Sequence, residues 1–151
     1  MRKTIICCLL LFLASNMFAQ QSPSTYDSAL ATRLKADEYG MKHYVLVLLK
    51  PGSNTAIDKA SEDSIFRGHL NNIGRLADEG KMVVAGPFGN NDSYRGLFIL
   101  NVSNFDDAKK LLSTDPAIKA NLLEPELYVW YGSAAMQEVV PIHKKIQKVN
   151  F

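Results

Sequence analysis

The distribution of apolar and polar residues predicts six central elements in the order strand, helix, strand, strand, helix, strand. Runs of apolar and β-branched residues bounded by turn residues indicate the strands. Helices are indicated by apolar residues spaced three and four apart behind a capping residue. The predicted strands are Lys42 to Lys50, Lys81 to Phe88, Tyr94 to Val102 and Glu126 to Tyr131.

The first central helix has the clearest pattern in the chain. Ser61 can cap it, Glu62 and Asp63 lie in its first turn, and Gly80 is its expected end. Its apolar face has the 3.6-residue period of an amphipathic helix. The predicted members of this face are Ile65, Phe66, His69, Leu70, Ile73, Leu76 and Ala77.

The second central helix is predicted from Phe105 to about Ser113, capped by Asn104 or Ser103. A further turn begins at Asp115-Pro116, because aspartate is a good N-cap and proline suits the first helical position. Outside the central elements, a helix is predicted from Asp27 to Tyr39 with Gly40 as its stop. The tail has a helical composition and is interrupted or restarted at Pro141.

The order of the six elements is that of the ferredoxin-like split βαβ fold, an α+β class. Its two helices cover one face of a four-stranded antiparallel sheet. The strands are nevertheless apolar on both faces, since Tyr44 to Leu49 contains no polar residue. Something must therefore bury the second face. A second copy packed face to face would do so as a dimeric α/β barrel, and the alternative is that the terminal helices fold back over the sheet.

A secretory signal peptide is predicted for residues 1–19, where Arg2 and Lys3 precede an apolar run from Ile5 to Leu13. This run is too short to cross a bilayer. We expect cleavage after Ala19 and a secreted or periplasmic protein without membrane attachment. The expected organisation is a leader and helix over 20–41, the central domain over 42–132 and a helical tail over 133–151.

Composition and charge narrow the function classes. The two cysteines, Cys7 and Cys8, fall inside the signal, so the mature chain has no thiol for catalysis, disulfides or metal binding. Removing Arg2 and Lys3 with the signal leaves 15 of the 17 basic residues against 15 acidic ones. This neutral balance, without a basic stripe, argues against nucleic acid as a partner.

His69 is the histidine that lies on the apolar face of the first central helix, whereas His43 and His143 have polar neighbours. A histidine in such a place is either a core residue with a satisfied hydrogen bond or a general acid or base. A carboxylate that accepts one ring N–H would leave the other nitrogen free to take a substrate proton. Asp115 is a candidate for this partner, and its alternative role is to cap the turn that follows it.

Several short motifs occur together in a specific order between about Lys42 and Tyr131. With them, the chain resembles the YCII-related (YciI-like) domain family. The motifs are Phe66-Arg67-Gly68-His69-Leu70, Leu76, Glu79-Gly80-Lys81, Val84-Ala85-Gly86-Pro87-Phe88, Asp106-Asp107-Ala108 and Thr114-Asp115-Pro116-Ala117.

The resemblance implies a homodimeric α/β barrel of ferredoxin-like protomers with a histidine and aspartate pair in the active site. The pair corresponds to His69 and Asp115. The family is similar to muconolactone-isomerase-type proteins and includes an aromatic-ring dehydrochlorinase. It therefore implies proton transfer, as isomerisation or elimination, on a small organic substrate. The signal peptide, the helix before the domain and the tail depart from the usual family member.

Three further residues are weaker candidates for substrate binding. Arg67 and Arg95 can bind a carboxylate or phenolate, and each can equally be a surface residue. Trp130 can line an aromatic slot or belong to the core or the dimer interface. No spacing typical of a metal or phosphate site is present, so no cofactor is expected, with haem ligation by His69 as a remote alternative.

Two other functions remain open from the sequence. The protein can be a non-catalytic dimer that binds a small molecule or another protein. Alternatively, His69 and Asp115 can serve the fold alone. A hydrogen bond between the two residues, together with access from solvent, would favour chemistry.

Overall fold

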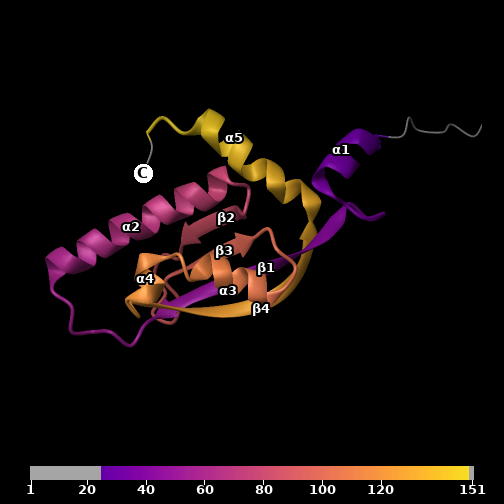
Figure 1. Ribbon diagram of the computed structural model, residues 1–151. Helices are drawn as coiled ribbons and strands as arrows, with labels where there is room; N and C mark the ends of the chain where they lie inside the picture. Colours follow the sequence, from indigo (N-terminus) through magenta and orange to yellow (C-terminus); the bar gives the residue numbers. More distant parts are fainter. Residues whose placement is uncertain (1–24, 150–151) are drawn as a thin grey trace, which may run out of the picture.

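The computed structural model describes residues 25–149, and the predicted signal peptide at 1–19 lies outside the described residues. The described chain is of the α+β class and follows the predicted order of central elements (Figure 1). In chain order the elements are α1 (Ser28–Leu34), β1 (Met41–Pro51), α2 (Lys59–Asp78), β2 (Met82–Pro87), β3 (Gly96–Leu100), α3 (Phe105–Leu112), α4 (Pro116–Lys119), β4 (Leu123–Ser133), the 3-10 helix η1 (Ala134–Glu138) and α5 (Val139–Ile146).

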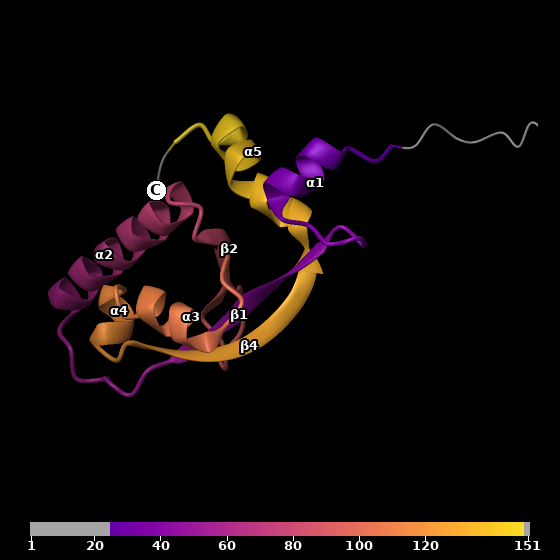
Figure 2. The ribbon, with the colours of Figure 1, turned by 45° about the vertical axis from the view of Figure 1, so that its right-hand side comes forward.

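The four strands form one antiparallel sheet in the order β2-β3-β1-β4. The predicted hairpin of β2 and β3 is confirmed. Helices α2, α3 and α4 lie together on one side of the sheet (Figures 1 and 2). Helix α1 lies near one end of β1 and β4, and α5 runs from there toward β2 and the end of α2. This sheet order is the one expected for a ferredoxin-like arrangement of βαββαβ elements.

Apolar side chains fill the space between the sheet and the three helices. They come from alternate positions of each strand, because successive side chains of a strand point to opposite faces. The helices contribute one side each. The buried members of this core are Val45, Val47, Leu49, Leu76, Met82, Phe98, Leu100, Ala108, Leu112, Ala117 and Leu123.

The second face of the sheet is covered at one end by the chain's own C-terminal segment. Tyr44, Val83 and Ile99 are buried there, and Met136 of η1 packs against them. The Tyr44 hydroxyl donates to the backbone carbonyl of Ser133 at 3.1 Å. The alternative in which terminal elements fold back over the sheet is thus realised for this end of the face.

The rest of the second face is open to solvent. Tyr128 and Trp130 of β4 share this face with Leu46 and Tyr44, to which the register pairs them. Their exposed fractions are 44% for Tyr128 and 36% for Trp130. An apolar face with two large exposed rings is left without cover in the described chain.

The predicted helix from Asp27 to Tyr39 is wrong in its end point. Asp27 does cap α1, accepting the N–H of Leu30 at 2.9 Å, but the helix ends at Leu34. Lys35 takes the left-handed conformation, with φ of 54°, and closes the helix. Gly40, expected as the stop, lies in the later turn before β1.

The cap of α2 also differs from the prediction. Asp58, not Ser61, is the N-cap, and its Oδ1 accepts the backbone N–H of Ser61 at 3.0 Å. The Ser61 hydroxyl donates to the second carboxylate oxygen at 2.7 Å. The two residues therefore form one hydrogen-bonded start, with aspartate as the acceptor.

The last strand is longer than predicted and the tail restarts earlier. β4 includes Pro125, opposite Leu49, and an edge strand tolerates proline because one of its sides needs no N–H donors. In the tail, α5 begins at Val139, so Pro141 lies in its first turn. The missing N–H of proline costs nothing there, since the first-turn N–H groups have no partner within the helix.

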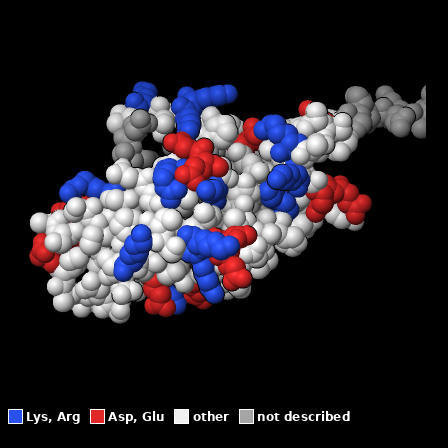
Figure 3. Space-filling model, viewed as in Figure 1, with Lys and Arg blue, Asp and Glu red and all other residues white. Residues whose placement is uncertain are grey.

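Charged side chains of both signs are interspersed on the face shown in Figure 3. Among residues 25–149, no helix combines the length and the apolar composition needed to cross a membrane.

Candidate active site

His69 lies in the middle of α2 and faces the turn between α3 and α4. Its Nδ1 is 2.8 Å from Oδ2 of Asp115, a residue 46 positions later in the chain. His69 is 8% exposed and Asp115 is 1% exposed. A carboxylate oxygen accepts hydrogen bonds, so this geometry assigns the ring proton to Nδ1.

Asp115 has two structural partners, one for each carboxylate oxygen. Oδ2 meets His69, and Oδ1 accepts the backbone N–H of Ala117 at 2.9 Å, which caps α4. Pro116 occupies the start of that short helix, as the sequence predicts. Capping and pairing with histidine, which were alternatives for this residue, coexist in the structure.

Two aromatic rings flank the imidazole. Phe66, one turn earlier on α2, meets the His69 ring edge to face, with centroids 5.8 Å apart. Phe98 of β3 lies at the same centroid distance, tilted by 33°. These rings leave the imidazole between apolar surfaces, where a hydrogen bond to a carboxylate is stronger than in water.

The second ring nitrogen of His69, Nε2, is reached by solvent. No hydrogen bond within residues 25–149 involves Nε2. Every buried side-chain nitrogen or oxygen of these residues has a partner, so Nε2, which has none, is not fully buried. In a neutral ring with its proton on Nδ1, Nε2 carries a lone pair directed away from Asp115. The pair can therefore accept a proton from a molecule that approaches Nε2.

Close contact between α2 and α4 brings the pair together. A Cβ atom added to Gly68 would lie 3.0 Å from Cγ of Pro116, so the two elements meet at van der Waals distance beside the pair. The absence of a side chain at Gly68 lets the backbone of α2 approach the turn.

The weaker candidates do not gather around His69 within one chain. Arg67 is exposed and lies two residues from His69, about 200° around the helix. Arg95 is exposed in the loop before β3, where its backbone N–H donates to the carbonyl of Leu49. Trp130 lies on the open face of the sheet, opposite the face that carries Phe98.

A polar cluster next to the pair was not found from the sequence. Asn72 is 8% exposed, and its Oδ1 accepts from Arg75 at 2.8 Å. The Thr114 hydroxyl shares its single proton between Oδ1 of Asn72 at 2.9 Å and the carbonyl of Leu111 at 2.7 Å. The available signal was its position three residues after His69, on the same side of the helix. Leu70 was predicted to face inward instead and is 47% exposed, so that prediction is wrong.

Residues 25–149 contain no group of three His, Cys, Asp or Glu side chains placed to hold a metal ion. At the pair itself, His69 and Asp115 are the available ligand types, and one oxygen of Asp115 is already used by the helix cap.

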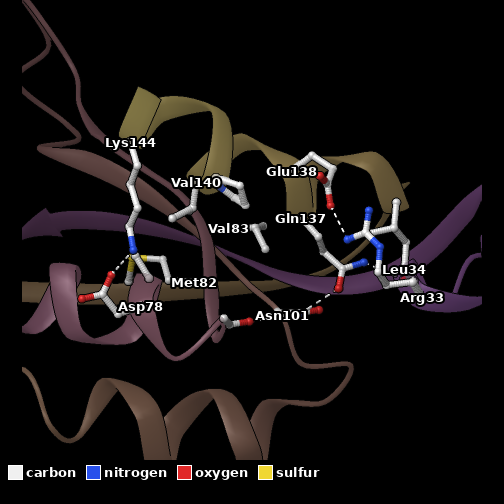
Figure 4. Close-up of a pocket in the computed structure, with 13 residues that line it drawn as sticks. Arg33, Leu34, Asp78, Met82, Val83, Asn101, Gln137, Glu138, Val140 and Lys144 are labelled. Carbon is white, nitrogen blue, oxygen red and sulfur yellow. Dashed lines mark hydrogen bonds and ion pairs between the residues drawn. The ribbon is translucent and has the colours of Figure 1, made fainter. Parts of the chain in front are cut away.

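A cavity of the structure lies away from the pair. It has a volume of about 440 Å³ and is lined by segments of α1, α2, β2, η1 and α5 (Figure 4). Arg33 pairs with Glu138 at 2.7 Å on one side, and Lys144 pairs with Asp78 on the other. Every charged lining residue thus has a partner of opposite sign, and no net charge selects a ligand.

A second group of titrating residues joins the end of α1 to β4. The Tyr131 hydroxyl donates to Asp37, and this hydrogen bond, with one from the N–H of Met41, holds the pKa of Asp37 below its ordinary value. The same bond raises the pKa of Tyr131. Both side chains are exposed, so this contact is a surface link and not a buried site.

No protein-family model and no curated protein matches the chain. Among solved structures, the chain is similar to a 5-chloro-2-hydroxyhydroquinone dehydrochlorinase from Burkholderia phenoliruptrix in complex with 2,5-dihydroxybenzoquinone. The identity is 18% and the TM-score is 0.42, over 57% of this chain and 92% of that one. The functional proposal therefore depends on the geometry of the site and on the sequence motifs.

Proposed function

We propose that the protein is a YciI-like acid–base enzyme that transfers a proton on a small organic substrate. His69 is the catalytic acid and base, and Asp115 holds its ring. The observation that carries the proposal is the 2.8 Å contact of His69 Nδ1 with a buried carboxylate, combined with solvent access at Nε2. Motifs on both sides of this pair supply the resemblance to the family.

The reaction follows from the proton positions. Nε2 of His69 takes a proton from a carbon next to a carbonyl or from a ring hydroxyl, and the electron pair moves into the carbonyl oxygen. Asp115 stabilises the imidazolium that forms, through the hydrogen bond to Nδ1. In an isomerisation, the carbonyl re-forms and Nε2 returns the proton to a different carbon of the conjugated system. In an elimination, the carbonyl re-forms as a leaving group departs with its bonding electrons from the adjacent carbon, and Nε2 gives its proton to that group or to water.

Deuterium exchange tests this proposal on a panel of compounds that share the reactive group. Small cyclic ketones, lactones and hydroxyquinones are incubated with the protein in D2O, and NMR detects loss of C–H signals. We expect exchange with at least one compound, and loss of that exchange in His69→Ala and Asp115→Asn. His143→Gln, in the exposed tail, is the control and retains it.

Two outcomes contradict the proposal. Exchange that continues at the full rate in both variants removes the roles of His69 and Asp115. Binding of the compounds without any deuterium exchange would support the alternative function, in which the protein is a dimer that binds a small molecule without catalysis.

We also propose that two copies pair through the open face of the sheet as a dimeric α/β barrel. The exposed rings of Tyr128 and Trp130 and the partly buried Leu46 and Leu97 support this, because a monomer would leave them in water. Sedimentation of the mature chain should show a dimer that Trp130→Lys weakens. A monomer at all concentrations contradicts the assembly and leaves the catalytic proposal to its own test.

The protein is further proposed to act outside the cytoplasm, after cleavage of residues 1–19. The basic start, the short apolar run and Ala19 support export. Cell fractionation and mass spectrometry of the purified protein test it. A protein that retains residue 1 and remains in the cytoplasm contradicts it.

A further inference from the structure

We propose that Asn72 is a positioning residue that fixes Asp115 relative to His69. This inference rests on the proposed function, since it assigns a role within the same site. Asn72 lies on α2, the helix that carries His69, and it holds Thr114, the residue directly before Asp115. One helix thereby supplies both the base and the group that holds the turn of its partner.

Three consecutive contacts connect α2 to the turn between α3 and α4. Gly68 lies against Pro116, His69 bonds to Asp115, and Asn72 bonds to Thr114. As the residue number rises along α2, the number of the contacted residue in the turn falls. The first contact is van der Waals packing, which limits approach but does not set the orientation of a side chain. The hydrogen bond of Asn72 is directional and lies on the other side of the pair.

The polar groups around Asn72 fix its amide orientation. Arg75 donates from Nη2 to Oδ1 of Asn72 and to Oγ1 of Thr114, at 2.8 and 2.9 Å. A guanidinium only donates, so the atom that faces it must be the amide oxygen. Arg75 is itself held by Glu79, with a distance of 2.7 Å. The turn is therefore joined to α2 through a side chain that has one defined orientation.

Backbone hydrogen bonds alone do not place the turn against α2. The N–H groups of Thr114 and Asp115 donate to the carbonyls of Leu111 and Leu112, which belong to the end of α3. These bonds fix the turn relative to its own helix. Among the described residues, side-chain contacts relate it to α2, and the hydrogen bonds that do not involve the catalytic pair come from Asn72 and Arg75, which both contact the Thr114 hydroxyl.

The fraction of His69 in its two neutral tautomers measures the position of Asp115. A well-placed carboxylate favours the Nδ1–H form, and a displaced one releases this preference. Ring 15N shifts of the full-length mature chain report the ratio directly. Global destabilisation leaves the ratio of the folded molecules unchanged, so a purely structural role would not alter it.

The experiment compares Asn72→Ala with Asn71→Ala, which removes a neighbouring exposed amide of the same helix. We expect the ratio to move about fivefold toward the Nε2–H form in Asn72→Ala, as the loss of one hydrogen bond predicts, and to stay unchanged in Asn71→Ala. Thr114→Val, which removes the hydroxyl and keeps the shape, should shift the ratio in the same direction. Thr114→Ser, which keeps the hydroxyl, should show the ratio of the unmodified protein.

Unchanged ratios in Asn72→Ala and Thr114→Val overturn the proposal. If Asn72→Ala does not fold, an unchanged ratio in Thr114→Val still overturns the proposal, and Arg75→Lys tests the share of the contact from Arg75 to Thr114. A normal shift of the ratio in a protein that exchanges no substrate proton would instead contradict the proposed function and leave the positioning role intact.

Discussion

Two substitutions of Asp115 separate its structural role from its chemical role. Asp115→Ala removes both acceptors, so the N–H of Ala117 and Nδ1–H of His69 lose their partner at a buried position. A lost N-cap costs about 1 kcal/mol. A lost hydrogen bond to a charged group costs about 1.5–3 kcal/mol. The expected loss of unfolding free energy is about 3 kcal/mol.

Asp115→Asn keeps a cap but changes the hydrogen-bonding pattern. Its Oδ1 can still accept from Ala117, which places the amide NH2 against Nδ1 of His69. Two donors cannot face each other, so the ring must move its proton to Nε2. We expect a stability loss of about 1 kcal/mol, an inverted tautomer and a nitrogen that can no longer accept a substrate proton. The same change in Ser-His-Asp triads lowers kcat by about 10⁴.

Urea unfolding and ring 15N shifts measure these effects. At one protein concentration, the midpoint of Asp115→Ala should fall by about 1–2 M, and that of Asp115→Asn by less than half as much. The Asn variant should show the Nε2–H form. Equal midpoints for the two variants, or an Nδ1–H ring in Asp115→Asn, would refute the assignment of one oxygen to the cap of α4 and the other to His69.

Two further predictions concern the helix contact and the surface link. Gly74→Ala should stabilise α2 by about 1 kcal/mol, because the space around its Cβ is open. Gly68→Ala should give no such gain, because its Cβ would lie 3.0 Å from Pro116. Thermal unfolding of both variants measures the difference, and equal gains would contradict the close contact. Tyr131→Phe should raise the pKa of Asp37 toward 3.8 in a 13C carboxyl titration. Because its pKa is lowered in the folded state, Asp37 stabilises the fold above pH 3.8 and loses this effect as the pH falls through the folded-state pKa. The variant should therefore lose more stability at neutral pH than in acid. An unchanged titration of Asp37 would contradict the link to Tyr131.

The order and type of the central elements could be predicted because each signal is local. The apolar period of α2, the cap at Asn104 and the Asp115-Pro116 start of α4 depend on residues within one or two turns. The ends of elements were less predictable. Lys35 ends α1 in a left-handed conformation that glycine usually provides, and β4 continues through Pro125 because it lies at the sheet edge.

Only the residues of the candidate site that belong to a recognisable sequence pattern could be predicted. His69 stood out as a polar residue on an apolar face, and the family resemblance selected Asp115. Asn72 had only its position three residues after His69 as a signal, because its partner Thr114 is 42 residues away and its amide belongs to no motif. A side chain whose role is to join two distant segments becomes visible only when the segments are placed together.

The C-terminal segment limits where a second copy can pack. η1 already buries Tyr44 and Val83 at one end of the open face, and its Met136 lies within 3.0 Å of a Cβ built on Gly132. A partner sheet centred on the whole face would collide with η1. The proposed dimer must therefore be centred toward Tyr128, which is 44% exposed. In the proposed dimer, the C-terminal segment would thus shift the interior shared by the two sheets toward the other end of β4.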